Sequence, residues 1–282
     1  MNLLLAAALV LSPLPAQDTV VSLARGGEVR LENLSGEVVV RAWDRDEVQV
    51  TDRDRGSSGL RVRPSDGGVR IETEGRRKDR HNVDIEVRVP SWANVHISGR
   101  TLDVGIAGIR GDVVVTNVRG DIRTQDTEGE LRLRSQQGEI EVSDASGEIV
   151  VSAQSDDVWL SGIRGEVEVR STSGDITLLD VSARVVRAET QDGDIEFSGE
   201  LLERGRYAFF VHDGDVELAL PESASAVVSA STFDVEFESD FPVRLQRYRG
   251  GQKFDFTLGE GSAQLELHVF DGEIRLVRQA GD

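Results

Sequence analysis

Glycine recurs every nine residues through the middle of the chain, and this period constrains the fold more than any other feature of the sequence. The positions in question are Gly111, Gly120, Gly129, Gly138, Gly147, Asp156, Gly165, Gly174 and Ala183. In most repeats an acidic, an aliphatic, a variable and a second aliphatic residue follow. A unit this short cannot bury its apolar side chains alone, so it must stack on copies of itself.

The residues just before these turns indicate a structural period of eighteen rather than nine. One set is mostly apolar and comprises Ile109, Thr127, Ala145, Ile163 and Val181. The alternate set turns polar after its first member and comprises Val118, Gln136, Gln154, Thr172 and Thr190. Helical periodicity near 3.6 is absent. The sequence therefore predicts an all-β fold, a parallel β-solenoid whose coils of about 18 residues each contain two strands and two different corners.

Alternation within each strand assigns side chains to the inside or the outside of the coil. The second and fourth residues after each turn are predicted to point inward: Val113/Val115, Leu131/Leu133, Ile140/Val142, Ile149/Val151, Val158/Leu160, Val167/Val169 and Ile176/Leu178. The Ile122/Thr124 pair is the exception that brings a hydroxyl inside. Glycine suits the corners because sharp turns often require positive φ, and Asp156 is a tolerable substitute there.

Three segments are predicted along the chain. Residues 1–17 form a signal peptide, residues 18–100 an antiparallel N-terminal β cap, and residues 101–282 the parallel β-solenoid with C-terminal closing strands. Strands in the cap alternate clearly but are irregularly spaced, with charged loops at 52–59 and 75–82. We expect the cap to block the open edge of the solenoid, where strands are prone to aggregate.

The count by nines breaks near residue 192. Asp192 occupies a turn position but the motif resumes one residue later, at Gly193, so we interpret Asp192 as an inserted residue. Further copies begin at Gly214 and Gly272 with looser spacing, and the last copy is expected to close the chain.

The first residues are typical of an export signal. Residues 3–11 form an apolar run too short to span a bilayer, and Ala16 is a small residue suited to cleavage. No Lys or Arg precedes the run, so a buried first strand is the alternative interpretation. The sequence has no cysteine for a lipoprotein signal and no second apolar run, so we expect no transmembrane segment in the mature chain. The expected location is the periplasm, the cell surface or the medium.

The formal net charge of −19 argues against two classes of partner. Nucleic acid requires a basic surface, and an anionic bilayer would repel this chain. We therefore predict no nucleic-acid partner, and the partners that fit are an envelope glycan or an envelope protein. The repeat pattern carries no signal for an oligomeric state.

The order of motifs resembles a known family. Residues 36–48 read Gly-Glu-Val-Val-Val-Arg-Ala-Trp-Asp-Arg-Asp-Glu-Val, and the Gly-[Asp/Glu]-Ile-x-Val ladder, Leu218-Ala219-Leu220-Pro221 and a final Gly-Glu-Ile-Arg-Leu at 272–276 follow. In this order they are similar to the bacterial adhesin-like β-solenoid domain family of unknown function. The resemblance covers nearly the whole mature chain and implies an exported, non-enzymatic β-solenoid, with no catalytic residues to carry over.

Outward acidic residues are predicted to stack in two ladders: Asp112, Glu130, Glu148 and Glu166 on one face, and Asp121, Glu139, Asp157 and Asp175 on the other. Carboxylates ~4.8 Å apart repel by roughly 0.9 kcal/mol in water. Relief could come from splayed side chains, from bound cations, or from Arg123, Arg132, Arg134 and Arg170. Calcium-binding nonapeptide repeats need Gly-Gly-x-Gly-x-Asp turns, and this chain has one glycine per turn. We predict no metal and no other cofactor.

No catalytic residue is predicted. The carboxylates are too numerous to single out the pair that a glycosidase needs, and short coils leave little room for a cleft. The four histidines, His81, His96, His212 and His268, are scattered without metal-like spacing, and no Gly-x-Ser-x-Gly signature is present. A polysaccharide-active enzyme is the less favoured alternative.

Two features could bind a partner. Trp159 lies in an outward column between Glu141 and Thr177, where an exposed indole could stack on a sugar or a partner side chain, with packing across strands as the alternative. A basic cluster could dock on an anionic envelope glycan or protein, or be a solvated loop, and comprises Arg76, Arg77, Lys78, Arg80 and His81.

These observations predict an exported, non-enzymatic β-solenoid surface module with a structural or adhesive role. A periplasmic sensor or scaffold that binds a partner protein is the alternative. Trp43 and Trp92 are expected in the core of the cap.

Overall fold

The computed structural model describes residues 18–53, 60–65, 67–73, 82–242 and 252–279. Within these ranges the chain forms strands and turns, and no helix is long and apolar enough to cross a membrane. The strands are β1 (Asp18–Ser22), β2 (Glu28–Trp43), β3 (Glu47–Asp52), β4 (Leu60–Ser65), β5 (Gly68–Thr73), β6 (Val83–Pro90), β7 (Asn94–Ala107), β8 (Val113–Arg119), β9 (Ile122–Gln137), β10 (Ile140–Ser155), β11 (Val158–Arg170), β12 (Ile176–Asp192), β13 (Ile195–Gly199), β14 (Arg206–Asp213), β15 (Val216–Leu220), β16 (Ala226–Ser239), β17 (Gln252–Leu258) and β18 (Ala263–Arg278).

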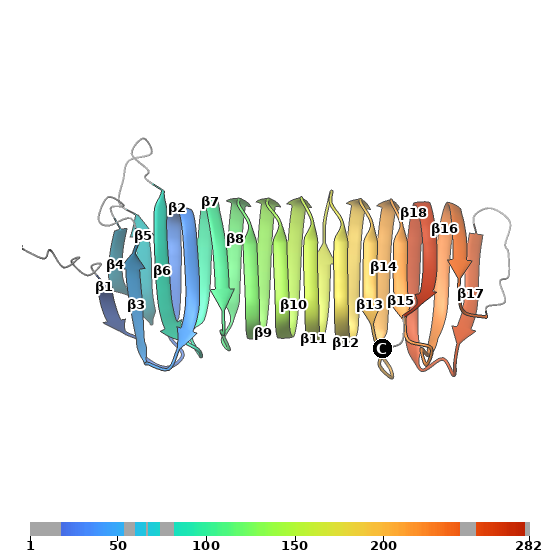
Figure 1. Ribbon diagram of the computed structural model, residues 1–282, viewed down its shortest axis with the longest axis horizontal. Helices are drawn as coiled ribbons and strands as arrows, with labels where there is room; N and C mark the ends of the chain where they lie inside the picture. The colour runs from blue at the N-terminus through green and yellow to red at the C-terminus, as the bar shows by residue number, and fades with distance from the viewer. Residues whose placement is uncertain (1–17, 54–59, 66, 74–81, 243–251, 280–282) are drawn as a thin grey trace, which may run out of the picture.

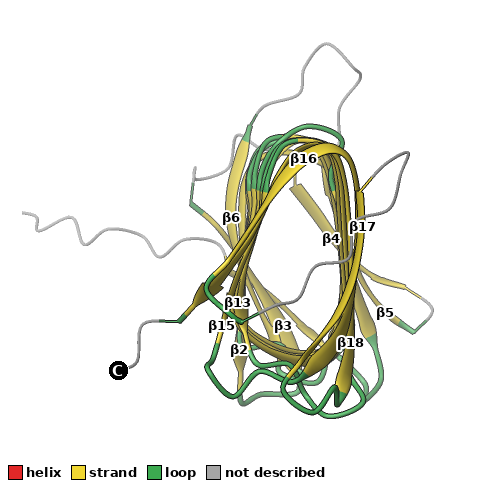
Figure 2. Ribbon diagram, turned by 90° about the vertical axis from the view of Figure 1, so that its right-hand side faces the viewer, coloured by secondary structure: helices red, strands yellow, loops and turns green. Residues whose placement is uncertain are grey.

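The strands stand side by side along the long axis of the molecule (Figure 1). Seen along that axis, the coils form a flattened tube with two broad walls joined by corners (Figure 2). In the central part β9, β10 and β11 pair in parallel, so that Gly129, Gly147 and Gly165 lie side by side at intervals of eighteen residues.

Glycine is required at these corners by both backbone conformation and space. Gly147 has a φ of 124° and Gly165 a φ of 123°, in the left-handed region that favours glycine. A Cβ on Gly147 would lie 2.1 Å from the carbonyl oxygen of Gly129, and one on Gly165 would lie 2.1 Å from that of Gly147. The nine-residue glycine period therefore marks the corners where the backbone of one coil approaches that of the next most closely. Asp156 occupies the same kind of position with a φ of 94°.

The core is a continuous column of aliphatic side chains inside the tube. Every aliphatic residue predicted to point inward is buried, including Ile140, Val142, Ile149 and Val151, and Thr124 is buried with them. The face assignment from strand alternation is confirmed.

The N-terminal region combines both kinds of strand pairing. Antiparallel pairs join β1 to β3, β3 to β6 and β4 to β5. However, β2 pairs in parallel with β5 and β6 on one side and with β7 on the other. This corrects the expectation of an antiparallel cap over residues 18–100: parallel stacking begins at β2, and residue 100 falls inside β7. The period was hidden because one layer is made of two strands, β5 and β6, separated by an insertion.

The inserted residue lies earlier than the count by nines indicated. Between β11 and β12 the register shifts from Gly165↔Ala183 to Glu166↔Val185, which leaves Arg184 as the extra residue of a β-bulge. Asp192, interpreted as the insertion from the sequence, instead pairs with Asp213 in the regular ladder between β12 and β14. A count of residues locates an insertion only to within one repeat, and here the structure moves it back by one half-coil.

The last strand of the chain does not lie at the end of the solenoid. Strand β18 pairs in parallel with β14 and β15 on one side and with β16 on the other. The end is formed by β16 and the antiparallel β17 (Figure 1). The register Val216↔Ile274 explains this order, because the motif at Gly272 repeats the motif at Gly214 and stacks directly on it. This corrects the expectation that the Gly272 copy closes the chain.

Replacing Ile140 by Asp is expected to destabilise the protein strongly. Ile140 is fully buried and lies between Ile122 and Val158 of the neighbouring coils, so the variant would place an unpaired charge among apolar side chains. We expect the free energy of unfolding to fall by about 4 kcal/mol. Glu141→Gln, one residue further and on the outer face, is the control and should change it by less than about 0.5 kcal/mol. Urea unfolding of both variants measures this, and equal losses would refute the face assignment.

Candidate functional site

Trp159 is exposed on the outer wall of the solenoid, as predicted from its position in strand β11. Its exposed fraction is 45%, which is high for a large apolar side chain in a stacked sheet. The parallel register places it beside Thr177 of β12, and the same row continues through β13, β15 and β18 with Glu196, Glu217 and Arg275. We call these five residues the Trp159 row.

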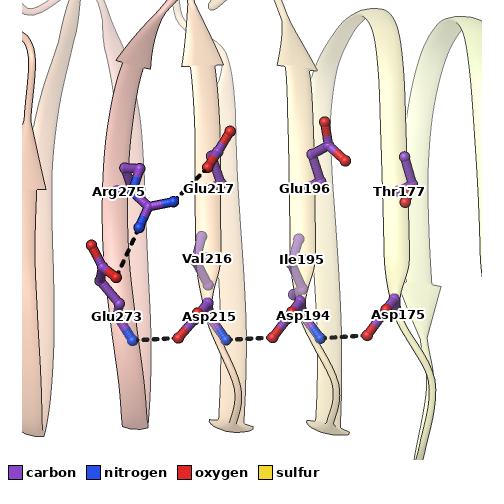
Figure 3. A pocket seen from close by; sticks show the side chains of 10 residues that line it. All are labelled: Asp175, Thr177, Asp194, Ile195, Glu196, Asp215, Val216, Glu217, Glu273 and Arg275. Atoms are coloured by element: carbon purple, nitrogen blue, oxygen red, sulfur yellow. Dashed lines mark hydrogen bonds and ion pairs between the residues drawn. The ribbon is translucent and has the colours of Figure 1, made fainter.

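A line of acidic residues runs beside the Trp159 row at the start of each strand. Figure 3 shows Asp175, Asp194, Asp215 and Glu273 on successive strands. The Oδ1 atom of each aspartate accepts a hydrogen bond from the backbone N–H of the next residue in the line, over 2.9, 2.8 and 2.7 Å in order. Asp157 accepts from the N–H of Asp175 in the same way, at 2.9 Å. We call these five residues the aspartate line.

These hydrogen bonds explain why an acidic residue follows each turn. Peptide groups turned out of the regular ladder at a corner need an acceptor, and the carboxylate of the preceding coil provides one. The second ladder does the same where Glu130 donates its N–H to Asp112 over 3.3 Å. The backbone amides therefore relieve part of the repulsion between stacked carboxylates, in addition to any relief from splayed side chains, cations or arginines.

Arginines relieve another part of this repulsion. Arg123 contacts Asp121 at 3.0 Å and Glu141 at 3.3 Å, and Arg132 contacts both Glu130 and Glu148. Arg170 pairs with Glu168 and Glu189, whereas no ion pair joins Arg134 to a described carboxylate. Within the described residues no group of three or more His, Asp or Glu side chains is arranged to hold a metal ion.

A shallow pocket of about 320 Å³ lies between the aspartate line and the Trp159 row. At one end Arg275 donates to Glu217 over 3.0 Å and to Glu273 over 2.9 Å, and its hydrogen bond to Glu217 is the main cause that raises the pKa of Arg275 (Figure 3). Glu196, in the middle, makes no ion pair with any described residue, and it lies two strands from Trp159. The carboxylate of Glu196 in this pocket thus lies on the same wall as the exposed indole of Trp159, which is outside the pocket lining.

The other predicted site residues are not brought to this pocket. The basic cluster of Arg76, Arg77, Lys78, Arg80 and His81 lies outside the described residues. Trp43 and Trp92, expected in the core of the cap, are both only partly buried. Trp92 packs against the core from outside and its Nε1 donates to Asp46 over 3.2 Å, while Trp43 donates to the carbonyl oxygen of Glu47 over 2.7 Å.

Comparison with known proteins identifies a family. The model of the Toastrack DUF4097 family matches residues 27–277, and no curated protein matches the chain. A solved structure of a putative adhesin from Bacteroides fragilis is similar at 13% identity, covering 93% of this chain and 97% of that chain with a TM-score of 0.45. A putative lipid binding protein from Parabacteroides distasonis is similar at 12% identity, covering 93% and 96% with a TM-score of 0.38. The resemblance to an adhesin-like domain of unknown function is confirmed, chiefly by the match over residues 27–277.

The aspartate line yields a stability prediction centred on Asp194. Asp194→Ala removes the acceptor for the N–H of Asp215, whereas Asp194→Asn keeps a side-chain oxygen and also removes repulsion from Asp175 and Asp215. We expect the alanine variant to lose about 1 kcal/mol of unfolding free energy and the asparagine variant to stay within about 0.5 kcal/mol of wild type. Thermal and urea unfolding compare the two. If both variants lose stability equally, the charge rather than the acceptor oxygen is what matters.

Proposed function

The chain belongs to the Toastrack DUF4097 family, and from this premise we propose that it is an exported, non-enzymatic surface module that binds a glycan through the Trp159 row. An adhesive role follows from such binding. The proposal covers three points that can be tested separately: the ligand, the absence of turnover and the export.

The proposal of a glycan ligand rests on the exposure of Trp159. Solvent contact by an indole is costly unless a partner covers it, and its flat face stacks well on the apolar face of a sugar ring. Thr177 is one strand away and Glu196 two strands away, about 5 and 10 Å along the wall. Their oxygens can accept hydrogen bonds from the hydroxyl or amino groups of a sugar stacked on the indole.

Binding without turnover fits the shape of this pocket. Catalysis by a pair of carboxylates depends on a site that excludes water and gives the two carboxyl groups different surroundings, so that their pKa values differ. The carboxylates of Asp175, Asp194, Glu196 and Asp215 are exposed on an open wall, and those of the three aspartates are engaged with backbone amides. The partly buried carboxylates of Glu217 and Glu273 are both paired with Arg275. This supports recognition of a saccharide over its cleavage.

Replacing Trp159 tests the ligand. We expect Trp159→Ala to weaken glycan binding about tenfold or more, because an aromatic stacking contact contributes about 1 kcal/mol beyond its buried area. Trp159→Phe, which keeps an aromatic face, should retain most of the affinity. A glycan array identifies the ligand, and titration calorimetry of both variants then gives the affinities. Unchanged binding by Trp159→Ala refutes the site, and capture of an envelope protein by the same residues would favour the sensor or scaffold alternative.

Export is tested by the mass of the mature chain. The apolar run at 3–11 and the small residue Ala16 support removal of the first sixteen or seventeen residues, a segment outside the described part of the structure. Intact mass spectrometry of protein recovered from the envelope fraction of its bacterial host should show a chain that begins after Ala16 or Gln17. Recovery of a chain that retains Met1 from that fraction would contradict cleavage.

A further inference from the structure

The wall opposite the Trp159 row carries a cluster of arginines. This second wall contains the C-terminal half of β12, then β14, the N-terminal half of β18, and β16, which pair in that order. In the end view β13 and β15, which carry part of the Trp159 row, are labelled together on one side of the tube (Figure 2). Arg184, Arg204 and Arg206 line a cavity of about 760 Å³ on the second wall. We call them the arginine cluster.

Two of the three arginines occupy irregular positions in the backbone. Arg184 is the extra residue of the β-bulge between β11 and β12, and a bulge redirects a side chain that a regular strand would place elsewhere. Arg204 has a φ of 60°, which is unfavourable for a residue with a Cβ, and its N–H donates to the carbonyl oxygen of Ser262 over 2.8 Å. Arg206 begins β14 and points outward beside Gln264 of β18. Departures from regular geometry thus bring positive charge to one hollow.

Arg184 and Arg206 of the arginine cluster lack the carboxylate partners that several arginines elsewhere on the solenoid have. Two or more carboxylates contact each of four other arginines: Arg123, Arg132, Arg170 and Arg275. In contrast, no described carboxylate lies within 4.0 Å of Arg184 or Arg206, although Glu166 and Glu266 also line the cavity. Arg204 contacts Glu203 at 3.8 Å, and both side chains are largely exposed.

Aromatic rings lie further along two of these four strands, β14 and β18. Phe210 of β14 stacks on His268 of β18 with centroids 4.9 Å apart and planes at 5°, and His212 stacks on Phe270 at 4.8 Å and 21°. Phe270 is 50% exposed. These four residues, which we call the aromatic strip, line a hollow of about 430 Å³ together with polar side chains that include Glu189 and Gln191.

Polar contacts hold the central ring of the aromatic strip in place. The Nδ1 atom of His268 lies 2.5 Å from Ser231 Oγ, and its Nε2 lies 2.7 Å from Glu266 Oε1. Both edges of the imidazole are therefore engaged, and Phe210 covers one face of the ring. Arg187 covers Phe210 with its guanidinium carbon 4.4 Å from the ring centroid. The strip is a preorganised surface rather than a set of independent side chains.

The arginine cluster and the aromatic strip form one continuous surface. Arg206, Phe210 and His212 alternate outward along β14, so charge and rings share a face, and four residues of strand separate Arg206 from Phe210 by about 13 Å. We propose that this wall binds an acidic polysaccharide, with sugar rings packed against the exposed edges of the aromatic strip and carboxylates held by the arginine cluster. The site lies apart from the Trp159 row and does not depend on the function proposed for that row.

The chemistry of this wall favours an acidic polysaccharide over other anions. A flat anionic bilayer or a nucleic acid would present dense negative charge to a chain with a net charge of −19. A uronic-acid polymer carries its charges at intervals between apolar ring faces, which matches three arginines beside stacked rings. Guanidinium groups bind carboxylates with paired hydrogen bonds, and the donors of Arg184 and Arg206 are available because no described carboxylate pairs with them.

Charge-removing variants test the arginine cluster with polygalacturonate as the probe. We expect the double variant Arg184→Gln/Arg206→Gln to bind polygalacturonate at least tenfold more weakly than wild type in low salt. Arg134→Gln is the matched control, because Arg134 is also exposed and without an ion pair to a described residue, but lies on β9 away from the cavity. The single Arg134→Gln exchange should change affinity less than twofold. Titration calorimetry gives both values, and melting curves verify that each variant is folded.

Phe270 tests the aromatic strip in the same assay. Phe270→Leu keeps an apolar side chain without a ring and should weaken binding several-fold, whereas Phe270→Trp should retain it. Trp159→Ala should leave polygalacturonate binding unchanged, which separates this site from the Trp159 row. Dextran, a neutral polymer, should not bind at this wall.

Four results would overturn the proposal. These are no binding of polygalacturonate by the wild-type protein, equal losses in the double variant and the Arg134→Gln control, unchanged binding by Phe270→Leu, and selective binding of phosphatidylglycerol vesicles or inorganic phosphate instead of the polymer.

Discussion

Successive backbones approach so closely at most of the corners that glycine is required there, and the register of the coils depends on this contact. The carbonyl oxygen of Gly129 lies where a Cβ of Gly147 would be, and the same relation joins Gly147 to Gly165. Because these crossings fix the coils relative to one another, they also fix which side chains stack in each column. A shift by one residue would turn every inward aliphatic side chain to the solvent.

The acidic surface follows from the same corners. Each of the four aspartates in the aspartate line accepts a hydrogen bond from the amide of the next coil, so an acid beside the turn is part of the architecture. Part of the net charge of −19 is therefore a consequence of building coils in this way. Negative charge on this protein is weak evidence for a cationic ligand, and an arginine without a carboxylate partner is the more informative observation.

The periodic part of the fold could be predicted from the sequence because its causes are local. Alternation placed Ile140 inside and Trp159 outside, and the glycine spacing gave the register between coils. The order of strands at both ends could not be predicted in this way, since β2 and β18 are inserted between strands that lie far from them in the sequence. Such insertions depend on which long-range pairing is more stable, and residue spacing does not report that.

Part of the second wall was nevertheless readable in the sequence. Phe210-Val211-His212-Asp213-Gly214 and His268-Val269-Phe270-Asp271-Gly272 have the same offsets from their glycines, so alignment on the turn would have predicted both stacked pairs. His212 and His268 are far apart in the sequence but lie on neighbouring strands, β14 and β18. The segment between these two copies forms β16 and β17, which stack outside β18.

Arg184 shows why the remaining part of that wall required coordinates. Its position in a bulge follows from the register shift between β11 and β12, which a count of residues cannot place within a half-coil. The bulge sets Arg184 beside the cavity that Arg206 reaches from a regular strand. A single extra residue can thus change which side chains one wall of a repeat protein presents, while the glycine contacts on either side preserve the register of the coils.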